Sequence, residues 1–388
     1  MGRRRARQEK RMMRGRNMNS IEENALSPRK EISGLPVYNA GISATVAQRV
    51  SGREDVVLLA SNENPYGASP AVTAALGALV PSRYSDSSCS VLRDTLSQQL
   101  GATPDRIVCG NGSEELIAAL CRAYLHKGDA VLTISPCFGL HEIEPLAAGA
   151  QVIKVPMTKA FDFDIDALVL ELSRRPKIVF ISSPSNPVGN AMSQPDLERV
   201  LDAVQPGTLF VLDEAYFELI DPGSPDGLKV LGQRPGLSWV VLRTFSKAYG
   251  LAGLRVGYGI ASDDGIARAM RAAVTPFNVN AAAQAAAIAA LLDDAWMKDA
   301  TARIRRDRSV LAERLRRLGV GVVPSQANFL FIELSIEAGP VARALLDKGI
   351  VVKPWMEAGY ANFIRVTIGT AGDNERFVQE LGRALGLS

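Results

Sequence analysis

The segment 242–257 constrains this chain more than any other, because a single lysine stands there in a loop of small residues between two apolar runs. The first run, 239–242, predicts a buried parallel strand, and Lys247 follows it between a serine and an alanine. A lysine at the end of such a strand suits an aldehyde cofactor, since its amine forms a Schiff base and burial or nearby cations lower its pKa. The alternative is an ordinary lysine on a surface loop. Three neighbouring side chains could hold a phosphate group of the cofactor, namely Thr244, Ser246 and Arg255.

The length of 388 residues suits two domains, or one large domain with an attached lobe. From residue 106 onward, apolar runs alternate with segments of helical period, which predicts an α/β fold with a parallel sheet. In the first part of this region we expect strands at 107–109, 130–134, 151–155, 177–182, 208–212 and 255–260. The later part predicts helices at 279–292 and 301–318, and strands at 328–333, 350–354 and 362–369.

The pattern Thr-Phe-Ser-Lys-Ala-Tyr-Gly-Leu-Ala-Gly-Leu-Arg-Val-Gly, at 244–257, resembles the pyridoxal-phosphate lysine signature of the class I/II aminotransferases. Within them it looks most like the histidinol-phosphate aminotransferase branch, and the resemblance covers roughly residues 31–385. It implies a fold-type I pyridoxal-phosphate transferase, with a mixed, mostly parallel sheet in a large domain and a smaller α/β domain. We accordingly expect a large domain at 61–275, a small domain at 21–60 and 276–388, and a disordered basic tail at 1–20.

A glycine-rich loop at 110–114 follows the expected strand at 107–109 and opens a helix. The free backbone N–H groups and the positive dipole end of a helix N-terminus form a natural phosphate seat. Gly112 and Ser113 are therefore expected to bind the cofactor phosphate. Ser113 could instead serve only as the N-cap of the helix.

The resemblance also assigns residues to the cofactor ring. Phe138 matches an aromatic position that stacks on the ring, although a core phenylalanine is the alternative. Asn186 and Tyr216 match residues that share the 3′ oxygen. Asp213 lies at the carboxyl end of a buried strand, where open α/β sheets bind ligands, and a carboxylate facing the pyridine nitrogen would keep it protonated and make the ring an electron sink. A helix N-cap is the alternative role for Asp213.

Substrate binding is expected at Arg365, whose strand Phe-Ile-Arg-Val-Thr-Ile-Gly resembles the one that carries the carboxylate-binding arginine. A planar guanidinium suits a bidentate pair with a carboxylate; a surface arginine on an edge strand is the alternative. Lys353 stands where many members of the branch have arginine. Tyr38 and Asn62, in the Leu-Pro-x-Tyr arm and the Asn-Glu-Asn-Pro turn, complete the expected substrate residues, although Asx and Pro residues also simply form turns.

Tyr84, in Arg-Tyr-Ser-Asp, matches a tyrosine that reaches the phosphate of the partner's cofactor in a homodimer with shared active sites. The family has proline where Ser85 stands, so the loop could be looser here.

The implied reaction is transfer of an amino group from L-histidinol phosphate to 2-oxoglutarate in histidine biosynthesis. In this reaction the amine of Lys247 moves a proton as general base and acid. The expected catalytic residues are Lys247, Asp213 and Tyr216. Two alternatives keep the cofactor, namely an aromatic aminotransferase and a threonine-phosphate decarboxylase. A third, from another class, is a non-catalytic pyridoxal-phosphate-binding regulatory domain.

Charge and composition argue against other partners. Residues 1–16 contain eight Lys or Arg and one Glu, so the remainder of the chain is mildly acidic and gives no reason to expect nucleic acid. We interpret the basic segment as a tail or an over-extended start before Met18, with a transit peptide as the alternative. No apolar run approaches the roughly 20 residues of a membrane span. The four cysteines are expected as reduced thiols of a cytoplasmic protein, and His126 and His141 as incidental residues rather than metal ligands.

Overall fold

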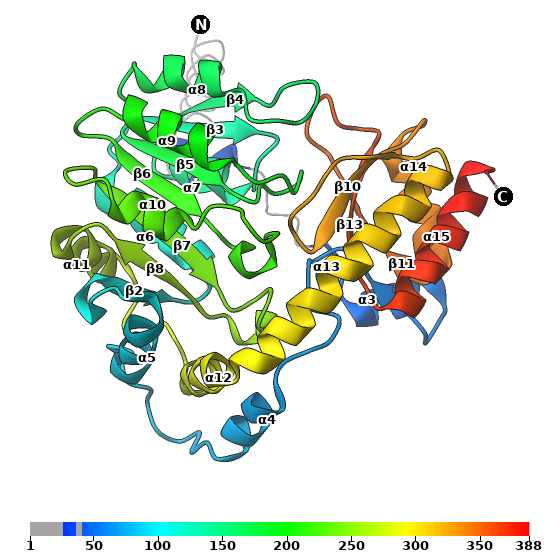
Figure 1. Cartoon of the computed structure of the whole chain (residues 1–388), viewed down its shortest axis with the longest axis horizontal. Coiled ribbons are helices and arrows are strands. Elements are labelled where there is room, and N and C mark those ends of the chain that lie inside the picture. Colours follow the sequence, from blue (N-terminus) through cyan, green and yellow to red (C-terminus); the bar gives the residue numbers. More distant parts are fainter. Residues whose placement is uncertain (1–25, 36–40, 388) are drawn as a thin grey trace, which may run out of the picture. The chain divides into compact units, whose positions relative to one another are not determined.

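The computed structural model describes residues 26–35 and 41–387 (Figure 1). Residues 26–35 contain one short helix, α2 (Lys30–Ser33), and belong to a different compact unit from the remainder of the chain. The predictions for the basic tail at 1–20 and for Tyr38 fall outside the described residues. Within the described ranges, no helix is long and apolar enough to cross a membrane.

A seven-stranded sheet forms the centre of the larger unit, in the order β2-β8-β7-β6-β5-β3-β4. Its strands are β2 (Ile107–Gly110), β3 (Ala130–Ser135), β4 (Gln151–Pro156), β5 (Ile178–Ser182), β6 (Leu209–Asp213), β7 (Trp239–Thr244) and β8 (Gly257–Ala261). Strands β4, β3, β5, β6 and β7 run parallel, whereas β8 runs antiparallel to both β7 and β2. The prediction of a mixed, mostly parallel sheet is confirmed.

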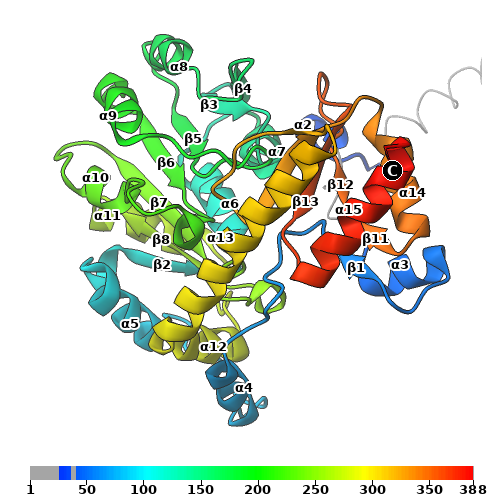
Figure 2. The same ribbon diagram turned by 45° about the vertical axis from the view of Figure 1, so that its right-hand side comes forward.

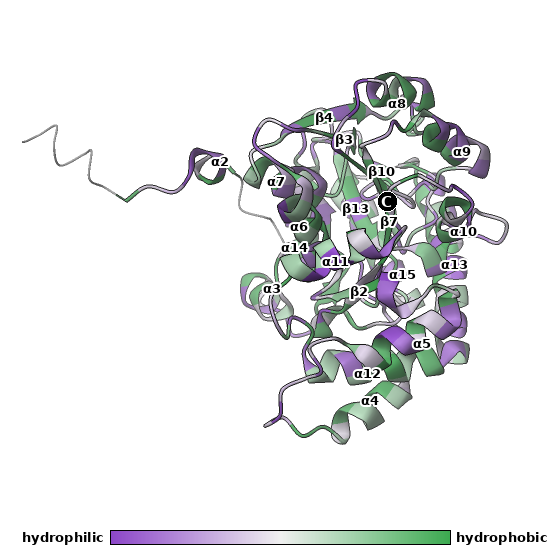
Figure 3. Ribbon diagram, turned by 90° about the vertical axis from the view of Figure 1, so that its left-hand side faces the viewer, coloured by the Kyte–Doolittle hydropathy of each residue, from purple (hydrophilic) through white to green (hydrophobic). Residues whose placement is uncertain are grey.

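Helices cover both faces of this sheet because successive side chains of each buried strand point to opposite sides. In β5, for example, Val179 joins one hydrophobic core and Phe180 joins the other. One face packs against α6 (Ser113–Tyr124), α7 (Leu140–Ala147) and α11 (Asp264–Ala273), and the other against α5 (Ser90–Leu100), α8 (Ile165–Leu172), α9 (Gln194–Ala203), α10 (Gly227–Gly232) and α12 (Ala281–Leu292). Figure 3 shows α8 and α9 with both hydrophobic and hydrophilic colours, as expected for helices that bury one face.

Helix α12 belongs to this core, although we expected it in the small domain. It packs against α4 (Pro70–Gly77) and α5, and its buried alanines share a hydrophobic core with the seven-stranded sheet. We therefore propose a domain boundary after residue 292 instead of at 276. Three short 3₁₀ turns also lie in the large domain, namely η1 (Pro104–Arg106), η2 (Phe217–Leu219) and η3 (Ala252–Leu254).

The small domain contains an antiparallel sheet in the order β12-β13-β10-β9 and a separate parallel pair, β1 with β11. Its strands are β1 (Val57–Leu58), β9 (Gly321–Val322), β10 (Phe329–Glu333), β11 (Ile350–Val351), β12 (Lys353–Pro354) and β13 (Phe363–Thr367). Its helices are α3 (Ala44–Ser51), α13 (Asp294–Arg317), α14 (Ala338–Asp347) and α15 (Ala371–Leu385). In Figures 1 and 2, α13 runs from α12 to the small sheet. The single strand predicted at 350–354 is two strands, because Val351 pairs with β1 and Lys353 pairs with β13.

Parallel strands end at a common edge, and that edge positions the site. Strands β3, β5, β6 and β7 all run in one direction, so the loops that follow them lie along the same side of the sheet. These loops carry Phe138, Asn186, Tyr216 and Lys247. Such an edge is where open α/β sheets place their ligands.

Candidate active site

Lys247 lies in the loop after β7, with a half-buried side chain. Its Nζ donates a hydrogen bond to the carbonyl oxygen of Ser61 at 3.0 Å. The pKa of this amine is lowered to about 7, mainly by burial and then by the positive charge of Arg365, while the carboxylates of Glu63 and Glu114 oppose the shift. A large fraction of the Lys247 amine is therefore uncharged near neutral pH, which is the form that attacks a carbonyl or accepts a proton.

Asp213 ends β6 with its carboxylate buried. Its Oδ1 accepts a hydrogen bond from the backbone N–H of Ala215 at 3.1 Å, and its Oδ2 lies 3.1 Å from His141 Nε2. No helix begins directly after Asp213, so the N-cap alternative is excluded. His141, which we expected to be an incidental residue, is the side chain that contacts this carboxylate. It is fully buried, and its ring stacks on Phe180 at 5.1 Å with an interplanar angle of 9°, which holds the imidazole against the carboxylate.

Tyr216 is held by residues of the Asn-Glu-Asn-Pro turn. The Nδ2 of Asn62 donates a hydrogen bond to Tyr216 Oη at 2.9 Å, and Asn62 Oδ1 accepts one from Thr367 Oγ1 at 3.1 Å. Asn328 Nδ2 in turn donates to the carbonyl oxygen of Asn62 at 2.9 Å. Asn62 is buried and adopts φ +54°, a left-handed conformation that asparagine tolerates better than most residues. Both side-chain atoms of Asn62 thus bind protein groups, and Asn328 and Thr367 are site residues that sequence analysis missed.

Arg365 reaches the same cluster from β13 of the small domain. Its Nη1 donates to Asn186 Oδ1 at 2.6 Å, and its Nη2 donates to the carbonyl oxygen of Ala60 at 2.5 Å. Lys353 is the partner of Arg365 in the β12–β13 register. Burial lowers the pKa of Lys353, and the nearby guanidinium of Arg365 lowers it further. The two cations predicted to bind substrate therefore lie side by side.

The residues predicted to bind the cofactor phosphate lie at and near the N-terminus of α6. Gly112 caps the helix with φ +76°, and a Cβ at this position would lie 2.4 Å from Arg255 Nη2, so only glycine lets the guanidinium approach. Ser113 is the first helical residue rather than the N-cap. Arg255 forms an ion pair with Glu114 at 2.8 Å, and Thr244 Oγ1 donates to Ser246 Oγ at 3.0 Å. Backbone N–H groups, hydroxyls and a guanidinium together form the donor set that a phosphate requires.

Phe138 lies in the loop after β3, half-buried, with its ring perpendicular to that of His141 at a centroid distance of 5.6 Å. This contact places the phenyl ring beside His141, which itself contacts the Asp213 carboxylate.

In the part of the chain that the structure describes, Tyr84 lies apart from the other predicted site residues. Its side chain is 86% exposed and stacks on Phe277 at 4.7 Å, with an interplanar angle of 28°. The next residue, Ser85, donates to the carbonyl oxygen of Val279 at 2.9 Å, which fixes this loop to the segment before α12.

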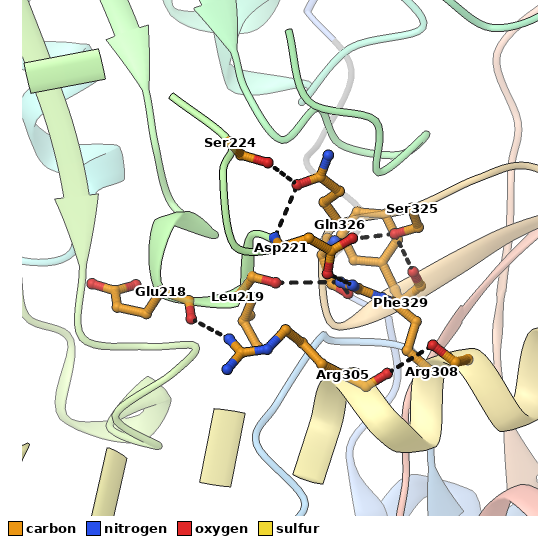
Figure 4. A network of polar contacts seen from close by, with 11 residues as sticks. Glu218, Leu219, Asp221, Ser224, Arg305, Arg308, Ser325, Gln326 and Phe329 are labelled. Atoms are coloured by element: carbon orange, nitrogen blue, oxygen red, sulfur yellow. Dashed lines mark hydrogen bonds and ion pairs between the residues drawn. The ribbon is translucent and has the colours of Figure 1, made fainter. Parts of the chain in front are cut away.

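A second network supports the segment after β6, as Figure 4 shows. Arg308 of α13 is buried and donates to the carbonyl oxygens of Ala327 at 3.1 Å and Leu219 at 3.3 Å. It also forms an ion pair with Asp221 at 2.5 Å. The Oε1 of Gln326 accepts a hydrogen bond from the backbone N–H of Asp221 at 3.0 Å. This network joins the large-domain segment that follows Tyr216 to the small-domain chain just before β10.

Among the described residues, no group of three or more His, Cys, Asp or Glu side chains lies together as a metal site would require. The four cysteines are unpaired and buried.

Known proteins are similar to this chain in both sequence and structure. A sequence model of the family "Aminotransferase class I and II" matches residues 54–381. Histidinol-phosphate aminotransferase 3 of Rhizobium meliloti is 40% identical over 360 residues, which cover 91% of this chain and 96% of that protein. Histidinol-phosphate aminotransferase of Anaeromyxobacter sp. is 40% identical over 359 residues, with 92% and 98% covered. The crystal structure of histidinol-phosphate aminotransferase from Sinorhizobium meliloti in complex with pyridoxal-5′-phosphate matches with a TM-score of 0.85 and 26% identity, over 94% of this chain and 99% of that one.

Proposed function

The chain belongs to the class I and II aminotransferase family, and from that membership we propose that it transfers the amino group of L-histidinol phosphate to 2-oxoglutarate with pyridoxal 5′-phosphate as its cofactor. The observation that carries this proposal is that relatives that match nearly the whole length of the chain are histidinol-phosphate aminotransferases. The reaction belongs to histidine biosynthesis.

The residues at the sheet edge fit the cofactor. The cradle of Gly112, Ser113 and Arg255 supplies the donors for its phosphate, and Phe138 supplies a ring face. When bound, pyridoxal phosphate supplies an aldehyde that takes up the amino group and a pyridine ring that delocalises the electrons left by the departing proton. Lys247, at the mouth of the sheet, would hold the aldehyde.

The carboxylate of Asp213 would face the ring nitrogen of the cofactor. The backbone N–H of Ala215 and the ring of His141 already fix this carboxylate. It would therefore need little reorganisation to stabilise a proton on that nitrogen. Asn186 and Tyr216 would hold the 3′ oxygen, and Asn62 orients the Tyr216 hydroxyl.

Lys247 moves the proton. A base works best when its pKa lies near the working pH, and burial sets the pKa of Lys247 to about 7. Its Nζ would therefore take and hold the proton that leaves the substrate carbon. For this task the amine would give up its hydrogen bond to the carbonyl oxygen of Ser61.

Arg365 and Lys353 form the anion site for both substrates. Histidinol phosphate carries a phosphate and no carboxylate, whereas glutamate and 2-oxoglutarate carry two carboxylates. One cationic site would then bind the phosphate in one half-reaction and a carboxylate in the other, because a guanidinium pairs with either group.

The active unit is proposed to be a homodimer. Tyr84 supports this, because a large aromatic side chain that is 86% exposed is suited to a partner surface. We propose that it contacts the phosphate of the partner's cofactor. The four unpaired cysteines fit a reducing compartment, and we place the reaction in the cytoplasm.

A panel of amino donors tests the proposed substrate. The purified protein, supplied with pyridoxal phosphate and 2-oxoglutarate, should show its highest kcat/KM with histidinol phosphate. Phenylalanine and tyrosine test the aromatic alternative, and release of carbon dioxide from threonine phosphate tests the decarboxylase. Much faster transamination of an aromatic amino acid would replace the histidinol phosphate assignment, and no turnover of any donor would favour a regulatory domain.

A further inference from the structure

The loop at residues 355–362 joins β12 to β13 and therefore begins and ends at the anion site (Figure 2). Lys353 and Arg365 are paired in the register of the two strands. The backbone N–H of Trp355 donates to the carbonyl oxygen of Phe363 at 2.9 Å, so the pairing continues into the loop. A displacement of this loop would act first on Lys353 in the edge strand β12, whereas Arg365 is also held by the pairing of β13 with β10.

Glu357, at the turn of this loop, contacts the large domain. Its Oε1 accepts a hydrogen bond from Ser135 Oγ at 2.9 Å and lies 3.4 Å from Lys154 Nζ. Its Oε2 accepts one from Trp355 Nε1 at 3.3 Å, which fixes the carboxylate within its own loop. Ser135 ends β3 and leads directly to Phe138. One carboxylate thus connects the anion site of the small domain to the loop that carries the ring-stacking residue.

The environment of Lys154 strengthens this contact. Its side chain is 30% exposed and that of Glu357 is 23% exposed, so solvent screens the pair only in part. Burial alone would lower the pKa of Lys154, but the hydrogen bond with Glu142 and the charge of Glu357 outweigh it and raise the pKa. Lys154 therefore remains a cation that both carboxylates share.

Aromatic side chains in and beside the 355–362 loop also pack against the large domain. Phe161, from the large-domain segment between β4 and α8, contacts Tyr360 at 6.3 Å, Phe363 at 5.4 Å and Phe331 at 5.9 Å between ring centroids. The backbone N–H groups of Leu334 and Ala338 hold the end of the loop within the small domain, by hydrogen bonds to the carbonyl oxygens of Asn362 and Ala361. Glu357 adds directional polar contacts between the loop and the large domain.

We propose that Glu357 is a positioning residue that latches the 355–362 loop to Ser135 and Lys154, and thereby holds Lys353 beside Arg365, where the two cations bind the anionic group of the substrate. The inference rests on the proposed function, since it concerns the anion site of that reaction. Glu357 contacts neither the proton-transfer residue nor the phosphate seat among the described contacts. Its loss should therefore weaken substrate binding and leave turnover at saturation nearly unchanged.

Two substitutions at Glu357 separate its charge from its hydrogen bond. Glu357→Gln keeps an acceptor for Ser135 and loses the ion pair, and KM for glutamate and for histidinol phosphate should rise about fivefold. Glu357→Ala loses both contacts, and KM should rise roughly tenfold or more. In each case kcat should stay within about twofold. Lys154→Met should resemble Glu357→Gln, and the double variant should be no worse than the more affected single one, because the two residues act through one contact.

Glu142→Gln is the matched control, since it removes the other carboxylate partner of Lys154 without touching the loop. It should leave both KM values at the wild-type level. A readout independent of turnover is hydrogen exchange of the holoenzyme, in which the 355–362 amides should exchange faster in Glu357→Gln and Glu357→Ala only. The affinity of the holoenzyme for maleate, a dicarboxylate that carries no amino group, should fall by the same factor as KM rises.

The outcomes separate the latch from the proposed reaction. Wild-type KM, maleate affinity and loop exchange in Glu357→Ala would overturn the latch, as would an equal effect of Glu142→Gln. If the wild-type protein does not use histidinol phosphate while Glu357→Ala still loosens the loop and weakens maleate binding, the latch stands and the donor assignment fails.

Discussion

Replacing Lys247 with methionine tests the electrostatic environment of the site without any substrate. The pKa of the Lys247 amine falls from 10.5 to about 7 in the folded protein, because burial and Arg365 disfavour its charged form. A shift of this size corresponds to about 4 to 5 kcal/mol. Because the folded pKa is the lower one, the unfolded chain binds more protons between about pH 7 and pH 10.5, and the free energy of unfolding rises with pH in that window. The penalty is complete below about pH 7 and disappears above about pH 10.5.

Methionine has a similar shape and no charge, so Lys247→Met should remove this penalty. The variant should gain stability over the wild type at pH 7, and its advantage should shrink by about 2 kcal/mol between pH 7 and pH 9. Urea unfolding of both cofactor-free proteins at pH 7, 8 and 9 measures the difference, and any constant packing effect of methionine cancels. Lys229→Met, at an exposed side chain, controls for the general removal of a lysine. An advantage that stays the same from pH 7 to pH 9 would refute the reasoning.

Three further experiments test the proposed roles. Asp213→Asn should leave cofactor binding, followed by absorbance, largely intact and lower kcat by several powers of ten, because a neutral amide cannot hold the charge on the ring nitrogen; near wild-type turnover would mean that the carboxylate is not needed. Arg365→Ala should lower kcat/KM for histidinol phosphate and for glutamate, each by about 1.5–3 kcal/mol in activation free energy, and a loss confined to one substrate would contradict a shared anion site. When Tyr84→Phe subunits are mixed with Lys247→Ala subunits, each hybrid dimer contains one site with both lesions and one with neither, so activity should exceed that of either parent if Tyr84 acts across the interface, and an absence of recovery would assign Tyr84 to its own subunit.

The parts of the site that depend on local sequence could be predicted. Lys247 and Asp213 each follow a short apolar run, and the parallel strands β6 and β7 that those runs form end at one edge of the sheet. The glycine loop before α6 could be predicted for the same reason, since a strand, a glycine turn and a helix follow one another directly. Its cap was less predictable, because Gly112 and Ser113 are both acceptable at a helix N-terminus.

His141 could have been found only with the helix that carries it. Helix α7 contains Pro145 in its interior, and an internal proline argues against a helix in sequence analysis. Without that helix, nothing indicated that the imidazole faces the sheet. A helix assigned to residues 140–147 would have placed His141 one turn beyond the loop that carries Phe138, on the buried face of the helix.

Asn328 and Thr367 depend on contacts far apart in the chain. Asn328 lies 266 residues from Asn62, and Thr367 lies 305 residues from it. Both contacts require the small domain to be folded against the Asn-Glu-Asn-Pro turn, and no local pattern encodes that packing. The split of the strand predicted at 350–354 has the same cause, because its two halves pair with strands from distant parts of the sequence.

The most direct measurement of the central claim is the position of the cofactor linkage. The purified protein should be loaded with pyridoxal phosphate, reduced with borohydride, digested and mapped by mass spectrometry. The account predicts a single modified peptide with the label on Lys247, and no label at that peptide in Lys247→Ala. A stoichiometric label on any other lysine, or a protein that takes up no cofactor, would contradict it.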